Sequence, residues 1–335
     1  MDNDQQKLKN EQAEILKNMK SSYKKERLIP FVGAGFSKNI IGYPDWDGFV
    51  RRLSRKIDKN QNFLKNLLGS NNLQSVEYFM IRTLIKNERM NDKDWYDTGK
   101  NYVKEELNDL FKRKKFNKDT WQAQVALISL KNFSLIYTTN WDDTLEKTCK
   151  EILSGTRYIL YYTIAQLENL KEKYDENIRA NKDARMKLII KLHGDYSDAK
   201  TIIASEYDYY HRMNAFNALD TVFQNDSLLN DFLFLGFSFN DVNINYLLYQ
   251  INYMRESVKP TNKVYLLSIL KPDYSYYQLF KDHKHINVFY LFEDLNEYNV
   301  FSSIRNKREK TIKLRDKTVE FLNKISNNEL KPLAN

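Results

Sequence analysis

The sequence predicts an α/β protein built on a doubly wound, mainly parallel sheet. Two patterns carry this prediction: short, almost continuously apolar runs recur along the chain, and amphipathic helical stretches alternate with them. Continuous hydrophobicity is typical of strands that helices cover on both faces. Six runs are predicted as buried strands: Leu28–Val32, Phe133–Tyr137, Leu188–Leu192, Phe232–Leu235, Val264–Leu270 and Ile286–Tyr290.

Helical patterns fill the segments between these runs and suggest how the chain is divided. We expect an N-terminal helical segment over 1–27, one α/β domain over 28–298 and a C-terminal helical tail over 299–335. The part from about 46 to 130 shows no strand pattern, so it is predicted to be a helical insertion. The charged stretch Glu168–Lys187 is predicted as a helix. The other predicted helices are Phe49–Ile57, Val76–Ile85, Trp95–Phe111, Trp121–Leu130, Trp141–Leu153, Val242–Met254 and Tyr274–His283.

Composition excludes several classes of protein. The 335 residues contain no apolar run near the roughly 20 residues that span a bilayer, and the first twenty residues are too polar for a signal peptide. We therefore expect a cytoplasmic protein without a membrane segment. Cys149 is the only cysteine, which excludes an internal disulfide and a multi-cysteine zinc site, and no metal is expected.

The net charge of +9 is concentrated in two basic clusters, Lys112–Lys115 and Arg305–Lys317. Such clusters can neutralise phosphates and bind nucleic acid. They are also compatible with solvated helix faces. Charge alone leaves both interpretations open.

Two glycines follow the first predicted strand, in the run Phe31-Val-Gly33-Ala34-Gly35-Phe36-Ser37. Glycine lets the backbone turn sharply and approach a ligand closely, and the amino end of a helix favours a pyrophosphate. The third glycine of the usual dinucleotide fingerprint is absent, because Lys38 stands there. The run is compatible with phosphate binding and with a simple tight strand exit.

Polar residues follow the second and third of these strands. Thr139, Asn140 and Asp142 come directly after Phe133–Tyr137; they suit a ligand site, or a helix cap formed by Asn140 or Thr139. His193 follows Leu188–Leu192 and can act as a base near neutral pH or make a structural hydrogen bond.

A fourth strand, Phe232–Leu235, is followed by Gly236 and Ser238, which leave room for a ribose or phosphate, and by Asp241, predicted to cap the next helix. Four strands of one sheet that all end in small or polar residues are expected to line a single crevice. This convergence predicts a nucleotide site.

At these residues the chain resembles the sirtuin family. The similarity rests on Gly33–Ser37, on Gly42-Tyr-Pro44-Asp45-Trp46, on Thr139-Asn140-Trp-Asp142, on His193-Gly194 and on Gly236-Phe-Ser238. It implies a Rossmann-like fold that binds NAD⁺, with Asn140 and His193 as catalytic residues at the reacting ribose. It also implies that Asp45 and Asp142 shape the nicotinamide pocket and that Gly236 and Ser238 lie near the adenosine ribose. The remaining NAD⁺-binding residues implied are Gly33, Ala34, Gly35, Phe36, Ser37 and Thr139.

Two departures separate the chain from sirtuin deacylases. Their four-cysteine zinc module is missing, and Asp47 stands where their Gly-x-Pro-Asp-Phe-Arg run ends in arginine. The pattern is similar to the zinc-free, sirtuin-like NAD⁺ hydrolases of bacterial anti-phage defence. This resemblance implies cleavage of NAD⁺, as substrate, to nicotinamide and ADP-ribose by a toxic abortive-infection effector that stays inactive until triggered.

The same resemblance implies a homo-oligomer with a separate regulatory partner, such as a HerA-type ATPase or an Argonaute-like protein. Two alternatives remain open at this point: a zinc-free protein deacylase or ADP-ribosyltransferase, and a basic, DNA-associated subunit that only binds NAD⁺.

Overall fold

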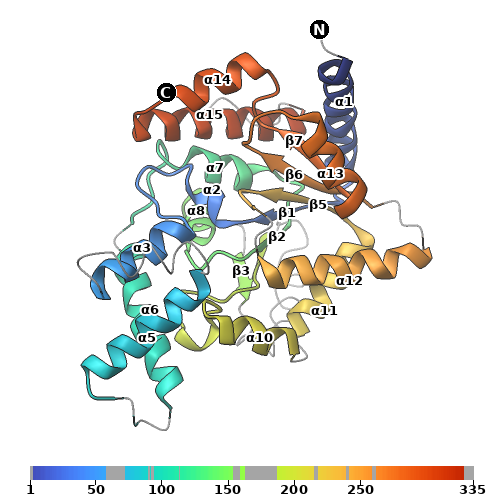
Figure 1. Ribbon diagram of the computed structural model, residues 1–335. Helices are drawn as coiled ribbons and strands as arrows, with labels where there is room; N and C mark the ends of the chain where they lie inside the picture. The colour runs from blue at the N-terminus through green and yellow to red at the C-terminus, as the bar shows by residue number, and fades with distance from the viewer. Residues whose placement is uncertain are drawn as a thin grey trace.

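The computed structural model describes residues 3–57, 72–89, 91, 94–112, 114–153, 159–162, 187–214, 218–238, 241–258 and 262–327. Within these residues one fully parallel sheet forms the centre of the molecule, in the order β3-β4-β2-β1-β5-β6-β7 (Figure 1). The predicted α/β class is therefore confirmed. The strands are β1 (Leu28–Val32), β2 (Leu135–Thr138), β3 (Ile159–Tyr162), β4 (Lys187–Lys191), β5 (Asp231–Leu235), β6 (Val264–Ser268) and β7 (Ile286–Tyr290).

All six predicted strands are present, with ends that differ by a few residues. The sequence did not predict β3, a strand of four residues at the edge of the sheet. It pairs with β4 alone, through a register that begins at Ile159 and Lys187. A run this short gives little periodic signal, and only its pairing with β4 identifies it as a strand.

Helices lie on both sides of the sheet, as a doubly wound fold requires. In Figure 1, α7 and α8 lie on one side and α11 and α12 on the other, as right-handed crossovers on either side of β1 require. The helices are α1 (Asn3–Lys24), α2 (Ala34–Ser37), α3 (Trp46–Ile57), α5 (Asn72–Lys86), α6 (Trp95–Phe111), α7 (Gln122–Ser129), α8 (Thr144–Ile152), α10 (Glu206–Asn214), α11 (Ala218–Leu229), α12 (Val242–Val258), α13 (Tyr274–Lys284), α14 (Leu295–Ser303) and α15 (Lys307–Ile325).

The predicted helices recur with shifted ends, apart from one that cannot be compared. The predicted helix within Glu168–Lys187 lies outside the described residues, except that Lys187 begins β4. The predicted helical tail consists of α14 and α15, so a helix already begins at Leu295. No helix in the described part of the chain is long and apolar enough to cross a membrane.

Two hydrophobic cores hold the described part of the chain together. The main core surrounds the sheet and includes Phe31, Tyr137 and Phe234, all fully buried. The second core joins α3, α5 and α6 through Leu53, Met80 and Leu107. These three helices lie at the end of the molecule away from α14 and α15 (Figure 1). Helix α7 differs from them, because it packs in the main core against α8 and α15.

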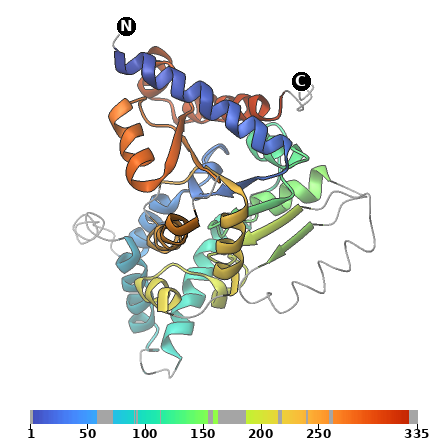
Figure 2. The ribbon, with the colours of Figure 1, turned by 90° about the vertical axis from the view of Figure 1, so that its right-hand side faces the viewer.

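The N-terminal helix covers one edge of the sheet. The side chain of Gln12, on α1, donates to the carbonyl of Val288 (2.8 Å) and accepts from the amide of Tyr290 (2.8 Å) on β7. It thus satisfies backbone groups that an edge strand would otherwise leave exposed. Figure 2 shows α1 crossing the end of the molecule where it also contacts α13 and α15.

The strand order places the predicted motifs side by side. The four strands that precede them are neighbours in the order β4-β2-β1-β5. The chain leaves β1 toward β2 on one side, whereas β5 continues toward β6 on the other. Ligands of open α/β sheets bind at such a switch point, outside the carboxyl ends of the strands.

Candidate active site at the carboxyl edge of the sheet

Two glycine loops meet backbone to backbone where β1 and β5 end. The amide of Gly33 donates to Leu235 O (2.9 Å), and the amide of Gly35 donates to Gly236 O (2.8 Å). Gly236 has a φ of +65°, and a Cβ at this position would lie 2.0 Å from the amide nitrogen of Phe36. The contact therefore requires a residue without a side chain, which explains the Gly236 that the sequence places after β5.

Asn140, Ser37 and Asp142 form a buried chain of hydrogen bonds beside these loops. The Nδ2 atom of Asn140 lies 3.2 Å from Gly33 O and 3.3 Å from Ser37 Oγ. Ser37 Oγ in turn donates to Asp142 Oδ2 at 3.0 Å. The loop after β2 is thereby tied to the loop after β1, as the predicted common crevice requires.

The side-chain oxygen of Asn140 takes no part in these hydrogen bonds. Asn140 is 7% exposed, and its buried Oδ1 atom has no hydrogen-bond partner in the part of the chain that the structure describes. A buried polar atom without a partner costs about 1–3 kcal/mol, so such atoms are rare unless they serve a function. The alternative that Asn140 or Thr139 caps the next helix is wrong, because Asp142 Oδ1 accepts the amide of Thr144 at the start of α8 (3.0 Å).

His193 lies one strand further along and is also enclosed. Thr138 on β2 pairs with Lys191 on β4, so Asn140 and His193 each stand two residues beyond a matched pair. The imidazole is 3% exposed and packs edge-on against Tyr209 of α10, with ring centroids 5.4 Å apart. Its Nε2 atom lies 3.5 Å from Asp241 Oδ2 and makes no hydrogen bond to any described residue.

Burial controls the charge of this histidine. Removal from water lowers the pKa of His193 to about 4, although Asp241 acts in the opposite direction. The ring is therefore neutral near pH 7, and the carboxylate of Asp241 faces it. A neutral imidazole can accept a proton, which is the role that the sequence suggested for it.

The turn after β4 holds His193 in place. Gly194 has a φ of +80°, and a Cβ there would lie 2.0 Å from the carbonyl oxygen of Thr201. The carbonyl of His193 accepts the amide of Ile203 (3.1 Å), and a short hydrogen bond joins Arg212 of α10 to the carbonyl of Leu192. Hydrogen bonds therefore fix the backbone before and after His193.

Sequence reasoning missed Lys191, which lies at the centre of the site. Its side chain is fully buried and donates to the carbonyl of Asp142 (2.7 Å), to Glu146 Oε1 (2.8 Å) and to Asp195 Oδ2 (2.6 Å). Burial alone would lower the pKa of Lys191, but the two carboxylates raise it. The lysine thereby connects the loop that carries Asn140 to the strand that carries His193. The signal in the sequence was a single lysine in the otherwise apolar run Leu188–Leu192.

The other predicted site residues lie in different surroundings. The side chain of Phe36 lies in the main core, and Ser238 is exposed. The amide of Thr139 donates to Val32 O at 3.3 Å, and Ala34 opens the short helix α2. Asp45 is bound to α3 and to Lys38: its Oδ1 accepts the amide of Gly48 (2.9 Å), and its Oδ2 pairs with Lys38 (2.5 Å).

The helices of the second core contact the loops of the site through Trp141 and through the segment after β4. Trp141, directly after Asn140, packs against Trp46 and Phe49 of α3 with ring centroids 5.3 and 5.6 Å apart. Ile202 and Ala204, in the segment after β4, are buried in the same core. Both catalytic candidates are therefore linked to α3, α5 and α6.

Parts of the two basic clusters are used inside the chain. Lys114 donates to Gly42 O (3.1 Å), Arg315 donates to Asp119 O (3.1 Å), and Lys317 pairs with Glu297 and Glu320. These contacts reduce the positive charge that the clusters present to a partner. Binding of nucleic acid through them stays a prediction.

Comparison with known proteins gives the same assignment as the motifs. A family profile described as a SIR2-like domain matches residues 134–289, which include β2 to β7. The NAD(+) hydrolase ThsA of Enterococcus faecium is 28% identical over 153 residues, covering 45% of this chain and 29% of that protein. ThsA of Bacillus cereus is 24% identical over 237 residues, covering 71% and 42%.

A third relative, defense-associated sirtuin 2 of Bacillus subtilis, is 23% identical over 259 residues, covering 75% of this chain and 22% of that protein. The chain thus spans less than half the length of these relatives. Together with the parallel sheet and the glycine loops at its switch point, these similarities confirm the resemblance to sirtuin-like proteins: residues 134–289 are similar to a SIR2-like domain.

Proposed function

We propose that the chain hydrolyses NAD⁺ to nicotinamide and ADP-ribose, with Asn140 and His193 as the catalytic residues. The observation that carries the proposal is that Asn140 Oδ1 and His193 Nε2 are both buried at the carboxyl edge of the sheet and have no hydrogen-bond partner among the described residues. Asn140 Oδ1 is a hydrogen-bond acceptor, and so is His193 Nε2 when it carries no proton. The hydroxyl groups of a ribose and a water molecule are the donors that would satisfy both atoms. The names of the ThsA relatives support the same reaction.

The reaction depends more on holding the substrate and a water molecule in position than on donating a proton to the leaving group. The bond from C1′ of the ribose to the nicotinamide nitrogen breaks, its electron pair stays with nicotinamide, and positive charge develops on the ribose. A water oxygen then bonds to C1′, and its proton passes to a base and on to solvent. Asn140 would orient the water or the ribose hydroxyls, and His193 would accept the proton.

The surrounding residues have supporting roles in this scheme. Asp142 would stabilise the positive charge that develops near C1′, while its hydrogen bond to Ser37 keeps its carboxylate in place. The glycine loops of Gly33–Gly35 and Gly236 leave backbone exposed to a diphosphate, as glycines at a sheet switch point commonly do. Lys191 would hold the loops of both catalytic residues at a constant separation.

The burial of the catalytic candidates supports a regulated enzyme. Ser37, Asn140 and His193 are each no more than 7% exposed, so substrate entry requires the crevice to open. Trp141 links the crevice to α3, and a partner or a second copy that moves α3 could open it. We extend the proposal to an anti-phage effector that is inactive until oligomerisation, or a HerA-type ATPase or Argonaute-like partner, activates it.

The test is to incubate the purified chain with NAD⁺, with and without a candidate activating partner, and to separate the products by chromatography. Free nicotinamide and free ADP-ribose in equal amounts are expected. His193→Ala should reduce the rate by ~10²–10⁴-fold, the usual contribution of a positioned base. Asn140→Ala should lose activity comparably, and His283→Ala, which changes an exposed histidine on α13, should retain it.

The products also separate this reaction from its alternatives. ADP-ribose attached to protein, or O-acyl-ADP-ribose, would indicate a transferase or deacylase instead. Cleavage that persists at the wild-type rate in both Asn140→Ala and His193→Ala would refute the proposed catalytic pair.

A further inference from the structure

Helix α12 presents a row of large side chains to solvent. Tyr249 and Tyr253 are 66% and 67% exposed, and Val242 and Tyr246 are exposed as well. The four residues recur at spacings of four, three and four, which places them on one face of the helix. In Figure 1 α12 lies at the periphery of the molecule, and its inner face packs in the main core and against α10 and α11. We call these four residues the α12 stripe.

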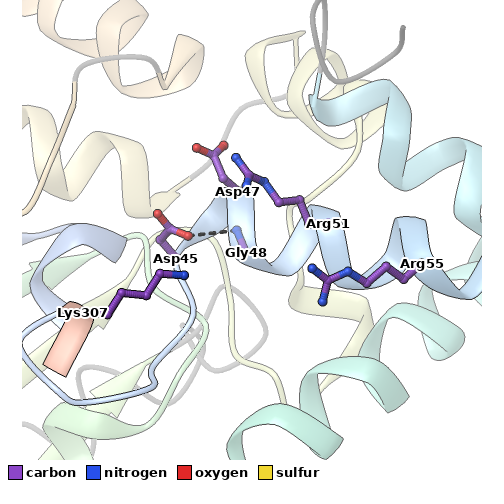
Figure 3. Close-up of a pocket in the computed structure, with 6 residues that line it drawn as sticks. All are labelled: Asp45, Asp47, Gly48, Arg51, Arg55 and Lys307. Atoms are coloured by element: carbon purple, nitrogen blue, oxygen red, sulfur yellow. Dashed lines mark hydrogen bonds between the residues drawn. The ribbon is translucent and has the colours of Figure 1, made fainter. Parts of the chain in front are cut away.

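The helix around the α12 stripe is free of charge over most of its length. From Val242 to Met254 the sequence contains no Lys, Arg, Asp or Glu, although these residues make up 29% of the chain. Helix α7 is likewise free of charged residues, and its residues 123–128 are all buried. By contrast α3 exposes Arg51 and Arg55, and Figure 3 shows both side chains extending from that helix. A helix without charged residues is typical of one that is covered on all sides.

The residue types of the α12 stripe are those of a protein interface. A tyrosine ring buries a large apolar area while its hydroxyl keeps a hydrogen bond. The cores of protein interfaces are enriched in aromatic residues and depleted of Lys, Glu and Asp. Single exposed apolar side chains are common, but a contiguous row of them marks a site of interaction. The stripe therefore has the composition of a covered surface, although a single copy of the chain leaves it open.

The spacing of the α12 stripe fits pairing with another helix. Alternating intervals of three and four residues form the seam of paired helices. The order four, three, four also reads the same in both directions along the helix. A second, antiparallel α12, related by a two-fold axis between Tyr246 and Tyr249, therefore brings Tyr246 opposite Tyr249 and Val242 opposite Tyr253. Such a self-complementary patch is what a symmetric dimer requires.

Charge favours a second copy over other partners. Two copies that each carry a net charge of +9 repel one another, and a face without charge is where this repulsion costs least. The same two-fold axis brings Asn245 opposite Gln250, and amide side chains can both donate and accept hydrogen bonds. A nucleic acid or an acidic protein would instead select a basic surface, which the stripe does not provide.

We propose that two copies of this chain dimerise through the α12 stripe, with the two helices antiparallel. The inference rests on the proposed function in one respect, since it gives a surface to the oligomer that this function includes. Asp241 caps α12 and faces His193, so the dimer contact lies on the helix that begins at the proposed active site.

The test measures the molar mass of the full chain by sedimentation at a series of concentrations, without NAD⁺. The wild type should reach at least twice the mass of a single chain. Tyr246→Lys and Tyr249→Glu should each raise the dissociation constant of the dimer by about tenfold or more, because each places a charge against a ring of the second copy. The variant with both substitutions should dimerise more tightly than either single variant, since antiparallel pairing puts each introduced lysine opposite an introduced glutamate.

Matched controls add the same charges at other exposed apolar positions. Leu279→Lys on α13 and Val300→Glu on α14 should change the dissociation constant less than twofold. All these positions are exposed, so each variant should keep the Tm of the wild type. A wild type that stays monomeric at every concentration would overturn the proposal, as would equal weakening by the control variants. A double variant no tighter than the single ones would overturn the antiparallel pairing. Because no turnover is measured, failure of the proposed NAD⁺ hydrolysis leaves this result intact.

Discussion

The imidazole of His193 and the carboxylate of Asp241 face each other, with 3.5 Å between Nε2 and Oδ2. Asp241 is itself held by two contacts. Its Oδ1 accepts the amide of Ile244 and caps α12, as the sequence predicted, while its Oδ2 accepts the hydroxyl of Tyr209 (3.2 Å). A rigid carboxylate directed at a histidine can orient the ring and stabilise its protonated form.

Asp241→Asn should therefore slow NAD⁺ cleavage by about 10–100-fold, part of what a positioned base contributes. Asparagine keeps the size and can still cap α12, but it lacks the negative charge that raises the pKa of His193. The acid limb of the kcat/KM profile should accordingly move to lower pH. Tyr209→Phe, which keeps that charge, is the control and should leave the limb where it is; an unshifted limb in Asp241→Asn would contradict the role.

The pH dependence of stability should report the burial of His193. The pKa of this group is about 4 in the folded chain and 6.5 when the burial is lost. Between about pH 6.5 and pH 4, His193 binds a proton in the unfolded chain but not in the folded chain. The free energy of unfolding therefore decreases as the pH falls through this range. The expected decrease is about 3 kcal/mol. Urea unfolding across this range should show it in the wild type and in His283→Gln, and a smaller slope in His193→Gln.

Lys191→Met should destabilise the chain by about 3–5 kcal/mol, because it leaves two carboxylates at a buried site without their cation. Burial already raises the pKa of Glu146 to about 6 despite the attraction of Lys191, so its protonation should become easier still in the variant. Urea unfolding measures the loss. Lys150→Met, at an exposed position of α8, should change the free energy of unfolding by less than about 0.5 kcal/mol; similar losses in both variants would argue against the network.

Gly236→Ala should cost about 2–5 kcal/mol, since it adds a left-handed residue with a side chain and a backbone clash with Phe36. Thermal unfolding should show a clear decrease in Tm. Gly48→Ala is the comparison, because its nearest contact would be a side-chain oxygen of Asp45 at 3.1 Å, which a shift of a few tenths of an ångström relieves, and it should stay within about 1 kcal/mol of the wild type. If the Tm of Gly236→Ala equalled that of the wild type, the two glycine loops would have to separate easily.

Much of the fold could be predicted because it depends on local patterns. Buried strands such as Leu28–Val32 are recognisable from continuous apolar runs, and helices such as Trp95–Phe111 from their period. The strand β3 escaped because its four residues form a strand only by pairing with β4. The membership of α7 in the main core also depends on contacts, with α8 and α15, that no local pattern contains.

The sequence by itself determined the α/β alternation, the motifs that follow four strands, and the types of residue available there, since these properties depend on neighbours along the chain. Tertiary structure alone decided that these four strands are adjacent, that Asp142 rather than Asn140 accepts the amide of Thr144 at the start of α8, and that Asn140 and His193 retain atoms without partners among the described residues. It also brought Lys191 to Glu146 and Asp241 to His193. Burial and long-range pairing set these relationships, because the free energy of a polar group depends on which atoms surround it in space.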